Sequence, residues 1–275
     1  MTPPMTPIEA NGIEANGILL YYEQNGAGEN CLIINGSGTD LRYRPNVMDT
    51  PLSNIFKVTS YDQRGLGQSE KPDTTYTMAD YADDAAAFIE ALSLGPALIL
   101  GISFGGMVGQ ELAIRHPRCV KKLSLFCTSP GGDGGASYPI HELAKLPPEE
   151  RTRKSIMLND NRITDAWISA HPDKYKALQA RANRNDYDHE PNYTKGIERQ
   201  LAARAKHDCW DRLSQIACPV LLGGGLFDDI ATPTSMQNMA SRIPNASLKL
   251  YKGGHLFMTQ DPNAFSDVAN FFKTQ

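Results

Sequence analysis

A serine flanked by glycines is the first group in this sequence that could perform covalent chemistry. Residues 101–106 read Gly-Ile-Ser-Phe-Gly-Gly; they follow the apolar run 97–100 and precede a helical pattern that stops at Pro117. A sharp turn from strand to helix pushes its central side chain outward and crowds the neighbouring backbone, where only glycine fits. The pattern predicts that Ser103 is a nucleophile at a helix N-terminus, where the helix dipole favours developing negative charge. The alternative is a serine that only caps the helix.

A serine hydroxyl becomes a useful nucleophile when a base takes its proton and an acid orients that base. Around such a turn the partners follow in chain order, the acid first and the histidine second. His255, in Gly-Gly-His-Leu-Phe, follows the last expected strand and is the predicted base. Two aspartates compete to be the acid in the loop after residues 219–225. We expect Asp228, three residues beyond Gly225, rather than Asp229. The remaining histidines fall at a helix end or in a helical insertion: His116, His141, His171, His189 and His207.

The elements that must position these groups alternate along the chain. Short apolar runs bounded by turn residues predict strands, and several are apolar at consecutive positions, which indicates burial on both faces. Strands alternating with helices predict an α/β fold with a mostly parallel sheet flanked by helices. The expected strands are 19–22, 31–34, 56–60, 97–100, 120–127, 219–222 and 248–251, with helices at 77–94 and 105–116.

The alternation stops in residues 133–217, which contain helix-like segments and no convincing strand. We interpret this stretch as a helical cap inserted before the last two strands, with residues 18–132 and 218–275 as the core and 1–17 as an N-terminal extension holding a tandem Ile-Glu-Ala-Asn-Gly repeat. The cap has 14 basic and 13 acidic side chains against an acidic remainder, which favours an anionic substrate; solvated helix faces explain the same counts. The expected cap helices are 142–145, 147–158, 164–170, 174–183 and 196–216.

Two further motifs carry a resemblance to a known family. Residues 62–69 read Asp-Gln-Arg-Gly-Leu-Gly-Gln-Ser, and residues 35–42 read Asn-Gly-Ser-Gly-Thr-Asp-Leu-Arg. With the serine turn and its partners, they make the chain resemble the α/β-hydrolases from about residue 18 to the end. The 35–42 loop is similar to that of 3-oxoadipate enol-lactonases, although Gly36 replaces a serine, Leu-Phe-Met follows His255, and the cap matches no motif of that group.

The resemblance implies roles for further residues. The 62–69 turn is structural, and the backbone N–H groups of Ser37 and Phe104 form an oxyanion hole. Asn35 either contacts the substrate, braces its loop or only forms a turn. The 35–42 loop together with the basic surplus of the cap predicts that Arg42 or a cap arginine holds a substrate carboxylate; the alternative is that Arg42 only caps its loop and the pocket is apolar. The cap is also expected to decide substrate choice, with Trp167 either facing inward or packing on the outside of the cap.

We therefore expect a cofactor-free serine hydrolase that cleaves a carboxylic ester or a lactone, an enol-lactone included, through an acyl-enzyme. A carboxylesterase or arylesterase, a carbon–carbon bond hydrolase, a perhydrolase and an aminopeptidase use the same fold, and fold alone does not separate them. A non-enzymatic alternative is a ligand sensor that retains the three residues.

Composition excludes several other classes. The net charge of −4, with 21% charged and 41% hydrophobic residues, is typical of a globular protein and gives little support to nucleic-acid binding. No run is long and apolar enough to span a membrane, and the start of the chain does not read as a signal peptide. Five cysteines without a C-x-x-C pair suggest neither disulfides nor a metal site and fit a cytoplasmic location. The expected partner is a small-molecule substrate; the oligomeric state, a homo-oligomer included, stays open.

Overall fold

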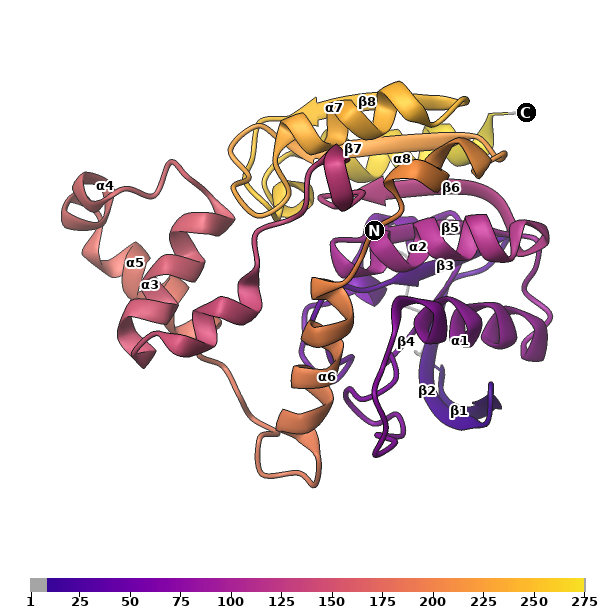
Figure 1. Ribbon diagram of the computed structural model, residues 1–275, viewed down its shortest axis with the longest axis horizontal. Coiled ribbons are helices and arrows are strands. Elements are labelled where there is room, and N and C mark those ends of the chain that lie inside the picture. Colours follow the sequence, from indigo (N-terminus) through magenta and orange to yellow (C-terminus); the bar gives the residue numbers. More distant parts are fainter. Residues whose placement is uncertain (1–8, 275) are drawn as a thin grey trace, which may run out of the picture.

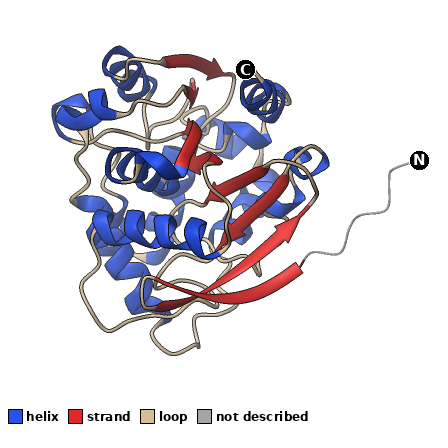
Figure 2. Cartoon of the chain, turned by 90° about the vertical axis from the view of Figure 1, so that its right-hand side faces the viewer, coloured by secondary structure: helices blue, strands red, loops and turns tan. Residues whose placement is uncertain are grey.

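A single eight-stranded sheet organises the chain. The computed structural model describes residues 9–274, and its strands lie in the order β1-β2-β4-β3-β5-β6-β7-β8. In this order each strand from β4 to β8 is parallel to its neighbour, whereas β2 is antiparallel to both β1 and β4. The expected mostly parallel sheet is thereby confirmed (Figure 2). The bounds are β1 Glu9–Ala15, β2 Ile18–Asn25, β3 Asn30–Ile34, β4 Lys57–Tyr61, β5 Ala97–Ile102, β6 Val120–Phe126, β7 Val220–Gly225 and β8 Ala246–Tyr251.

Helices cover both faces of this sheet. Helices α1 (Met78–Ala91), α2 (Phe104–Arg115) and α7 (Pro233–Arg242) share one apolar cluster with the sheet, and α8 (Asn263–Lys273) packs in the other. Leu32 and Ile34 of β3 point into the first cluster, and Cys31 and Ile33 point into the second. Because both faces are covered, β5 is buried at every position and β3 is buried from Cys31 to Ile34.

Part of the predicted N-terminal extension belongs to the sheet. Residues 1–8 lie outside the described part of the chain, but β1 pairs with β2 along its whole length. Asn16 and Gly17 join the two strands with φ angles of 51° and 73°. Asn-Gly with two positive φ values is the preferred two-residue hairpin turn, because its twist matches that of the strands. The five-residue repeat therefore supplies an edge strand and a turn from residue 9 onward.

Between β6 and β7 the chain forms the helical insertion. It contains a short 3-10 helix (Ile140–Lys145), α3 (Pro148–Asn159), α4 (Asp165–Ala170), α5 (Pro172–Ala182) and α6 (Tyr193–Ala205). Helices α3 to α5 lie to one side of the sheet in Figure 1, and α6 runs between them and the core. None of the helices within residues 9–274 combines the length and apolar character needed to cross a bilayer.

The predicted last cap helix, 196–216, is wrong beyond residue 205. After α6 the chain forms an isolated β-bridge between Asp208 and Gly131, and a separate 3-10 helix follows at Trp210–Gln215. Cys209, Leu213 and Ile216 are fully buried in the core cluster that includes α2. Their helical spacing arises from packing on the core rather than from a continuing helix. The cap therefore leaves the core near Gly131 and rejoins it at Asp208, before the predicted boundary at residue 217.

Candidate active site

The serine turn has the strained geometry that the sequence predicts. Ser103 has φ 55° and ψ −114°, and its N–H donates to the carbonyl of Phe126 at 2.8 Å. A Cβ at Gly101 would lie 2.5 Å from the carbonyl oxygen of Gly105, and one at Gly105 would overlap the carbonyl oxygen of Ile34. Glycine is required at both positions because the start of α2 approaches β5 at Gly101 and the end of β3 at Gly105 at backbone distance. The surrounding packing thus holds Ser103 in a conformation that a non-glycine residue rarely adopts.

His255 lies within hydrogen-bonding distance of both expected partners. Its Nδ1 is 2.8 Å from Oδ2 of Asp228, and its Nε2 is 3.0 Å from Oγ of Ser103. A carboxylate only accepts, so Nδ1 carries the proton and the Nε2 lone pair faces the serine hydroxyl. Asp228 is 1% exposed and His255 is 6% exposed. The structure thus brings the three predicted residues together in the order needed to move a proton from serine to histidine.

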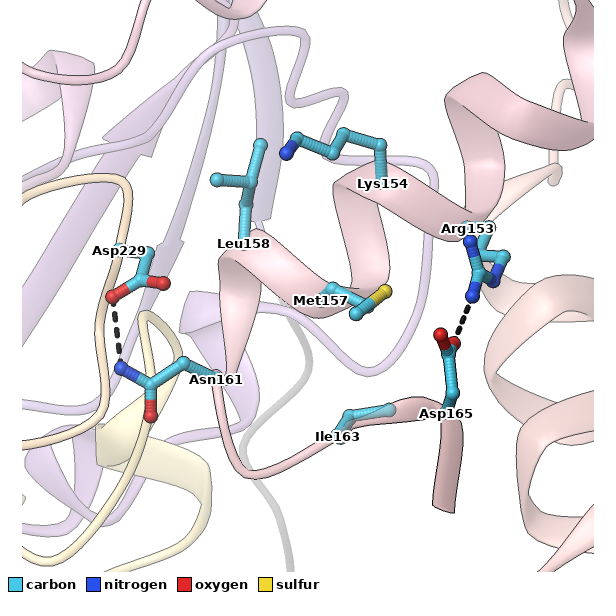
Figure 3. A pocket seen from close by; sticks show the side chains of 8 residues that line it. All are labelled: Arg153, Lys154, Met157, Leu158, Asn161, Ile163, Asp165 and Asp229. Carbon is cyan, nitrogen blue, oxygen red and sulfur yellow. Dashed lines mark hydrogen bonds and ion pairs between the residues drawn. The ribbon is translucent and has the colours of Figure 1, made fainter. Parts of the chain in front are cut away.

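The neighbouring Asp229 faces away from this group. Its Oδ1 accepts from the side-chain amide of Asn161 at 2.8 Å, and the two groups point toward one another in Figure 3. It lines a hollow of about 290 Å³ beside α3, whose lining includes neither Ser103 nor His255. Asp228, in contrast, accepts at Oδ1 from the N–H groups of Ile230 and Ala231, so both its oxygens are fixed. Of the two competing aspartates, only Asp228 contacts the histidine.

Backbone groups of the cap hold both catalytic loops, which sequence reasoning missed. The carbonyl of Asn159, the last residue of α3, accepts from the N–H of His255 at 2.5 Å. The carbonyl of Leu158 accepts from the N–H of Asp229, and the N–H of Asn161 donates to the carbonyl of Phe227. Any residue type supplies these backbone groups, so the sequence carried no signal for them. The end of α3 therefore positions the acid loop and the histidine loop at once.

The loop after β3 lies against the serine. A Cβ at Gly36 would be 3.5 Å from the Cβ of Ser103, and Phe104 is the first residue of α2, so its N–H has no acceptor within the helix. Asn35 is 5% exposed and donates from Nδ2 to the hydroxyl of Ser60 at 2.9 Å. Of the three readings of Asn35, the geometry supports bracing of the loop. Ser37 follows Gly36, and its Oγ has no hydrogen-bond partner in residues 9–274.

Two predicted substrate contacts are not brought to the site. The guanidinium of Arg42 binds Asp40 and Glu190, with distances of 2.6 Å and 2.5 Å, and stacks on the ring of Tyr187 at 3.5 Å. These two carboxylates already neutralise the charge that was expected to meet a substrate. Trp167 lies on α4, at the outer end of the cap in Figure 1, and stacks on His171. Both expectations are therefore corrected: Arg42 links the loop to the cap, and Trp167 packs within the cap.

The 62–69 turn is built from paired polar groups, as expected of a structural element. The carboxylate of Asp62 accepts from the N–H groups of Leu41 and Gln68 at 2.8 Å and 2.9 Å. Arg64 forms a buried two-point ion pair with Asp84, at 2.7 Å and 2.6 Å. A Cβ at Gly67 would overlap the Asp62 carboxylate. This turn therefore anchors the 35–42 loop, through Leu41, beside the serine.

A buried cluster of metal-ligating residue types lies on the far side of α2. Glu111, His207 and Cys209 bring one ligand atom each within 4.8 Å of one another. Arg212, however, donates to both carboxylate oxygens of Glu111, at 2.9 Å and 2.5 Å, and Cys209 donates to the same carboxylate at 3.3 Å. The guanidinium already supplies the positive charge that Glu111 needs. This cluster gives no support to a metal site.

Comparisons with known proteins agree with the fold. RutD of Caulobacter sp. (strain K31), whose name provisionally calls it a carbamate hydrolase, is 30% identical over 270 residues, covering 92% of this chain and 95% of that protein. The 3-oxoadipate enol-lactonase 2 of Acinetobacter baylyi is 25% identical and covers 92% of both chains. The crystal structure of the enol-lactonase from Burkholderia xenovorans LB400 superposes with a TM-score of 0.75 at 22% identity, covering 96% of this chain and all of that one, which shows a common fold.

The family model described as the alpha/beta hydrolase fold matches residues 32–262. That range includes the loop after β3, the serine turn, the cap and all three residues of the proton relay. It covers well over half of the chain, and relatives named as hydrolases match it almost end to end. By its sequence and by its sheet, the protein belongs to the alpha/beta hydrolase fold family.

Proposed function

We propose that this protein is a serine hydrolase that needs no cofactor and cleaves a carboxylic ester or a lactone through an acyl-enzyme. The observation that carries the proposal is the relay in which His255 lies 3.0 Å from Ser103 Oγ and 2.8 Å from Asp228 Oδ2. A serine held this way by a histidine and a buried carboxylate is the arrangement that acyl transfer requires.

The first half of the reaction uses the relay to form a bond. Ser103 Oγ attacks the substrate carbonyl carbon while Nε2 of His255 accepts the hydroxyl proton. Asp228 stabilises the resulting imidazolium and keeps Nδ1 as its donor. When the tetrahedral intermediate collapses, the carbon–oxygen bond to the leaving group breaks and His255 returns the proton to that oxygen. For a linear ester the products of this half are a free alcohol and an acyl-Ser103 ester. For a lactone the single product is an acyl-Ser103 ester whose acyl chain carries the newly freed hydroxyl or enol.

Deacylation repeats these steps with water as the nucleophile. His255 takes a proton from the water, which attacks the acyl carbon, and Ser103 leaves with that proton. In both halves the oxyanion is held by the backbone N–H groups of Phe104 and Ser37, one at the N-terminus of α2 and one on the loop beside Ser103. Donors fixed in place before reaction stabilise the developing charge without reorganising. A lactone substrate is supported further by the similarity to the Acinetobacter baylyi enol-lactonase.

Active-site labelling tests this function directly. A fluorophosphonate probe should label the wild-type protein and fail to label Ser103→Ala, which removes only the hydroxyl from an otherwise unchanged turn. Turnover of 4-nitrophenyl hexanoate should fall by ~10³-fold or more in the same variant. Equal labelling of both proteins would refute the nucleophile. A wild type that is labelled once but shows no multiple turnover on any ester or lactone would instead indicate a ligand sensor.

A further inference from the structure

A buried arginine, Arg204, has no carboxylate partner in the described part of the chain and lines a partly open cavity near the serine turn. Arg204 of α6 is 5% exposed; Nη1 donates to the carbonyl of Tyr138 at 2.9 Å, and Nε has no partner. No acidic side chain within residues 9–274 forms an ion pair with it, whereas Arg153, Arg162, Arg184 and Arg199 of the cap all have one. Burial of a charge without a counter-ion costs several kcal/mol in general. Such a cost is retained where a ligand supplies the missing charge.

The cavity is lined mainly by apolar surface, with a few polar groups among it, and is of ligand size. Its volume is about 200 Å³, and other unpartnered buried atoms belong to residues of its lining: Ser129 Oγ, His141 Nδ1 and His207 Nδ1. A water molecule occupies roughly 30 Å³ in the liquid, so the space accepts a carboxylate with a short chain. The full lining is Met107, Ser129, Gly131, Ala136, Ser137, Pro139, His141, Arg204, Ala205 and His207.

Helix α6 fixes the position of Arg204 relative to the reacting groups. Gly196, Gln200 and Arg204 recur every four residues on its buried face. Gly196 packs on Gly65 at backbone distance, and Gln200 accepts from the N–H of Gly38 at 2.8 Å, in the loop beside Ser103. Arg204 is one turn further along the same face. A helix held at two points in this way gives its third buried side chain little freedom to move.

The cavity wall also begins close to the nucleophile. Met107 is one turn along α2 from Ser103, roughly 6 Å at 1.5 Å per residue. Ser129 follows β6, whose Phe126 carbonyl accepts from the N–H of Ser103. Segments that adjoin Ser103 along α2 and β6 therefore form part of the cavity wall.

We propose that Arg204 binds a carboxylate on the acyl part of the substrate, so that the preferred substrates are esters or lactones of acids that carry a second carboxylate. This inference rests on the proposed hydrolase function and deepens it. Arg204 takes the role that sequence reasoning gave to Arg42 or a cap arginine. A guanidinium fork matches a carboxylate, and its charge-assisted hydrogen bonds grow stronger away from water.

Paired esters test the assignment. The mono-4-nitrophenyl ester of adipic acid carries the carboxylate, and 4-nitrophenyl hexanoate is its neutral counterpart. Arg204→Gln should lower kcat/KM for the adipate ester by roughly 10- to 150-fold and change it less than about threefold for hexanoate. Arg204→Lys should recover part of the difference. Arg199→Gln, on the same helix but paired with Asp73 at the surface, is the matched control and should leave the ratio unchanged.

Two further measurements separate this idea from a structural role and from the hydrolase function. Arg204→Gln should be at least as stable to heat as wild type, because it removes a buried charge that lacks a counter-ion. Free adipate should bind to the Ser103→Ala variant in a calorimetric titration. It should not bind to the double variant that carries both Ser103→Ala and Arg204→Gln. The inference would be overturned if Arg204→Gln lowered kcat/KM equally for both esters, or if adipate bound equally well with and without the substitution at residue 204. If the wild-type protein binds adipate but is not labelled by the fluorophosphonate, the proposed hydrolase function would be overturned and the role of Arg204 in carboxylate binding would stand.

Discussion

The carboxylate of Asp228 contacts the ring of His255 with one oxygen and the backbone of its own loop with the other. Oδ2 accepts a hydrogen bond from Nδ1–H of His255 at 2.8 Å. Oδ1 accepts hydrogen bonds from the N–H groups of Ile230 and Ala231 at 2.8 Å and 2.9 Å. The two backbone bonds fix the plane of the carboxylate, and the carboxylate in turn fixes the ring. The tautomer of His255 is therefore set by the backbone of the loop after β7.

The first prediction compares two adjacent aspartates. Asp228→Asn should lower kcat by roughly 10³-fold or more, because an amide can present a donor to Nδ1 and favour the wrong tautomer. Asp229→Asn should change kcat by less than about threefold, because its partner is Asn161 on the cap. Steady-state kinetics on 4-nitrophenyl hexanoate measures both. The reverse ranking would assign the acid to Asp229.

The second prediction concerns Gly105, the second residue of α2. Gly105→Ala should destabilise the fold by about 3 kcal/mol or more and remove activity, because its Cβ would overlap the Ile34 carbonyl. Gly109→Ala, four residues along the same helix, meets only leucine methyl groups at 3.2 Å and 3.3 Å. It should stay within about 1 kcal/mol of wild type, since alanine favours the helix. Urea unfolding measures both; similar losses would show that the turn tolerates a side chain.

The third prediction concerns the link between the 35–42 loop and the cap. Arg42→Gln should destabilise more than Glu190→Gln, because Arg42 also neutralises Asp40, whose side chain is 2% exposed. A double-mutant cycle between Arg42 and Glu190 should give a coupling of about 1 kcal/mol. Neither substitution should alter the preference for the adipate ester. If Arg42→Gln abolished the preference for the adipate ester over hexanoate, Arg42 would be the residue that contacts the substrate carboxylate.

The fourth prediction is a pH dependence of stability. Burial lowers the pKa of His207 to about 4, from 6.5 when exposed. Between these values the unfolded chain binds a proton that the folded protein does not, so stability is complete above about pH 6.5 and falls toward pH 4. The loss is on the order of 3 kcal/mol. Unfolding in urea at several pH values should show this slope in wild type and a shallower one in His207→Gln; parallel slopes would contradict it.

The sequence by itself determined the fold class and most of the elements, and it predicted the residues of the candidate site. A glycine on each side of Ser103, a buried strand before it and a helix after it specify the turn, because only that local arrangement needs those residue types. The apolar runs gave seven of the eight strands, and the order of acid and histidine along the chain followed from the fold class. Local sequence carries this information because backbone geometry and side-chain period are local properties.

Only the tertiary structure decided what depends on distant partners. Asp228 and Asp229 are adjacent and chemically identical, and their roles differ because one faces His255 and the other Asn161. Arg42 and Arg204 are equally basic in sequence, yet two carboxylates surround the first and a cavity borders the second. The edge strand β1 and the helix break after residue 205 were missed for the same reason. Pairing and burial between segments far apart in the chain set them, and no window of sequence contains both members of such a contact.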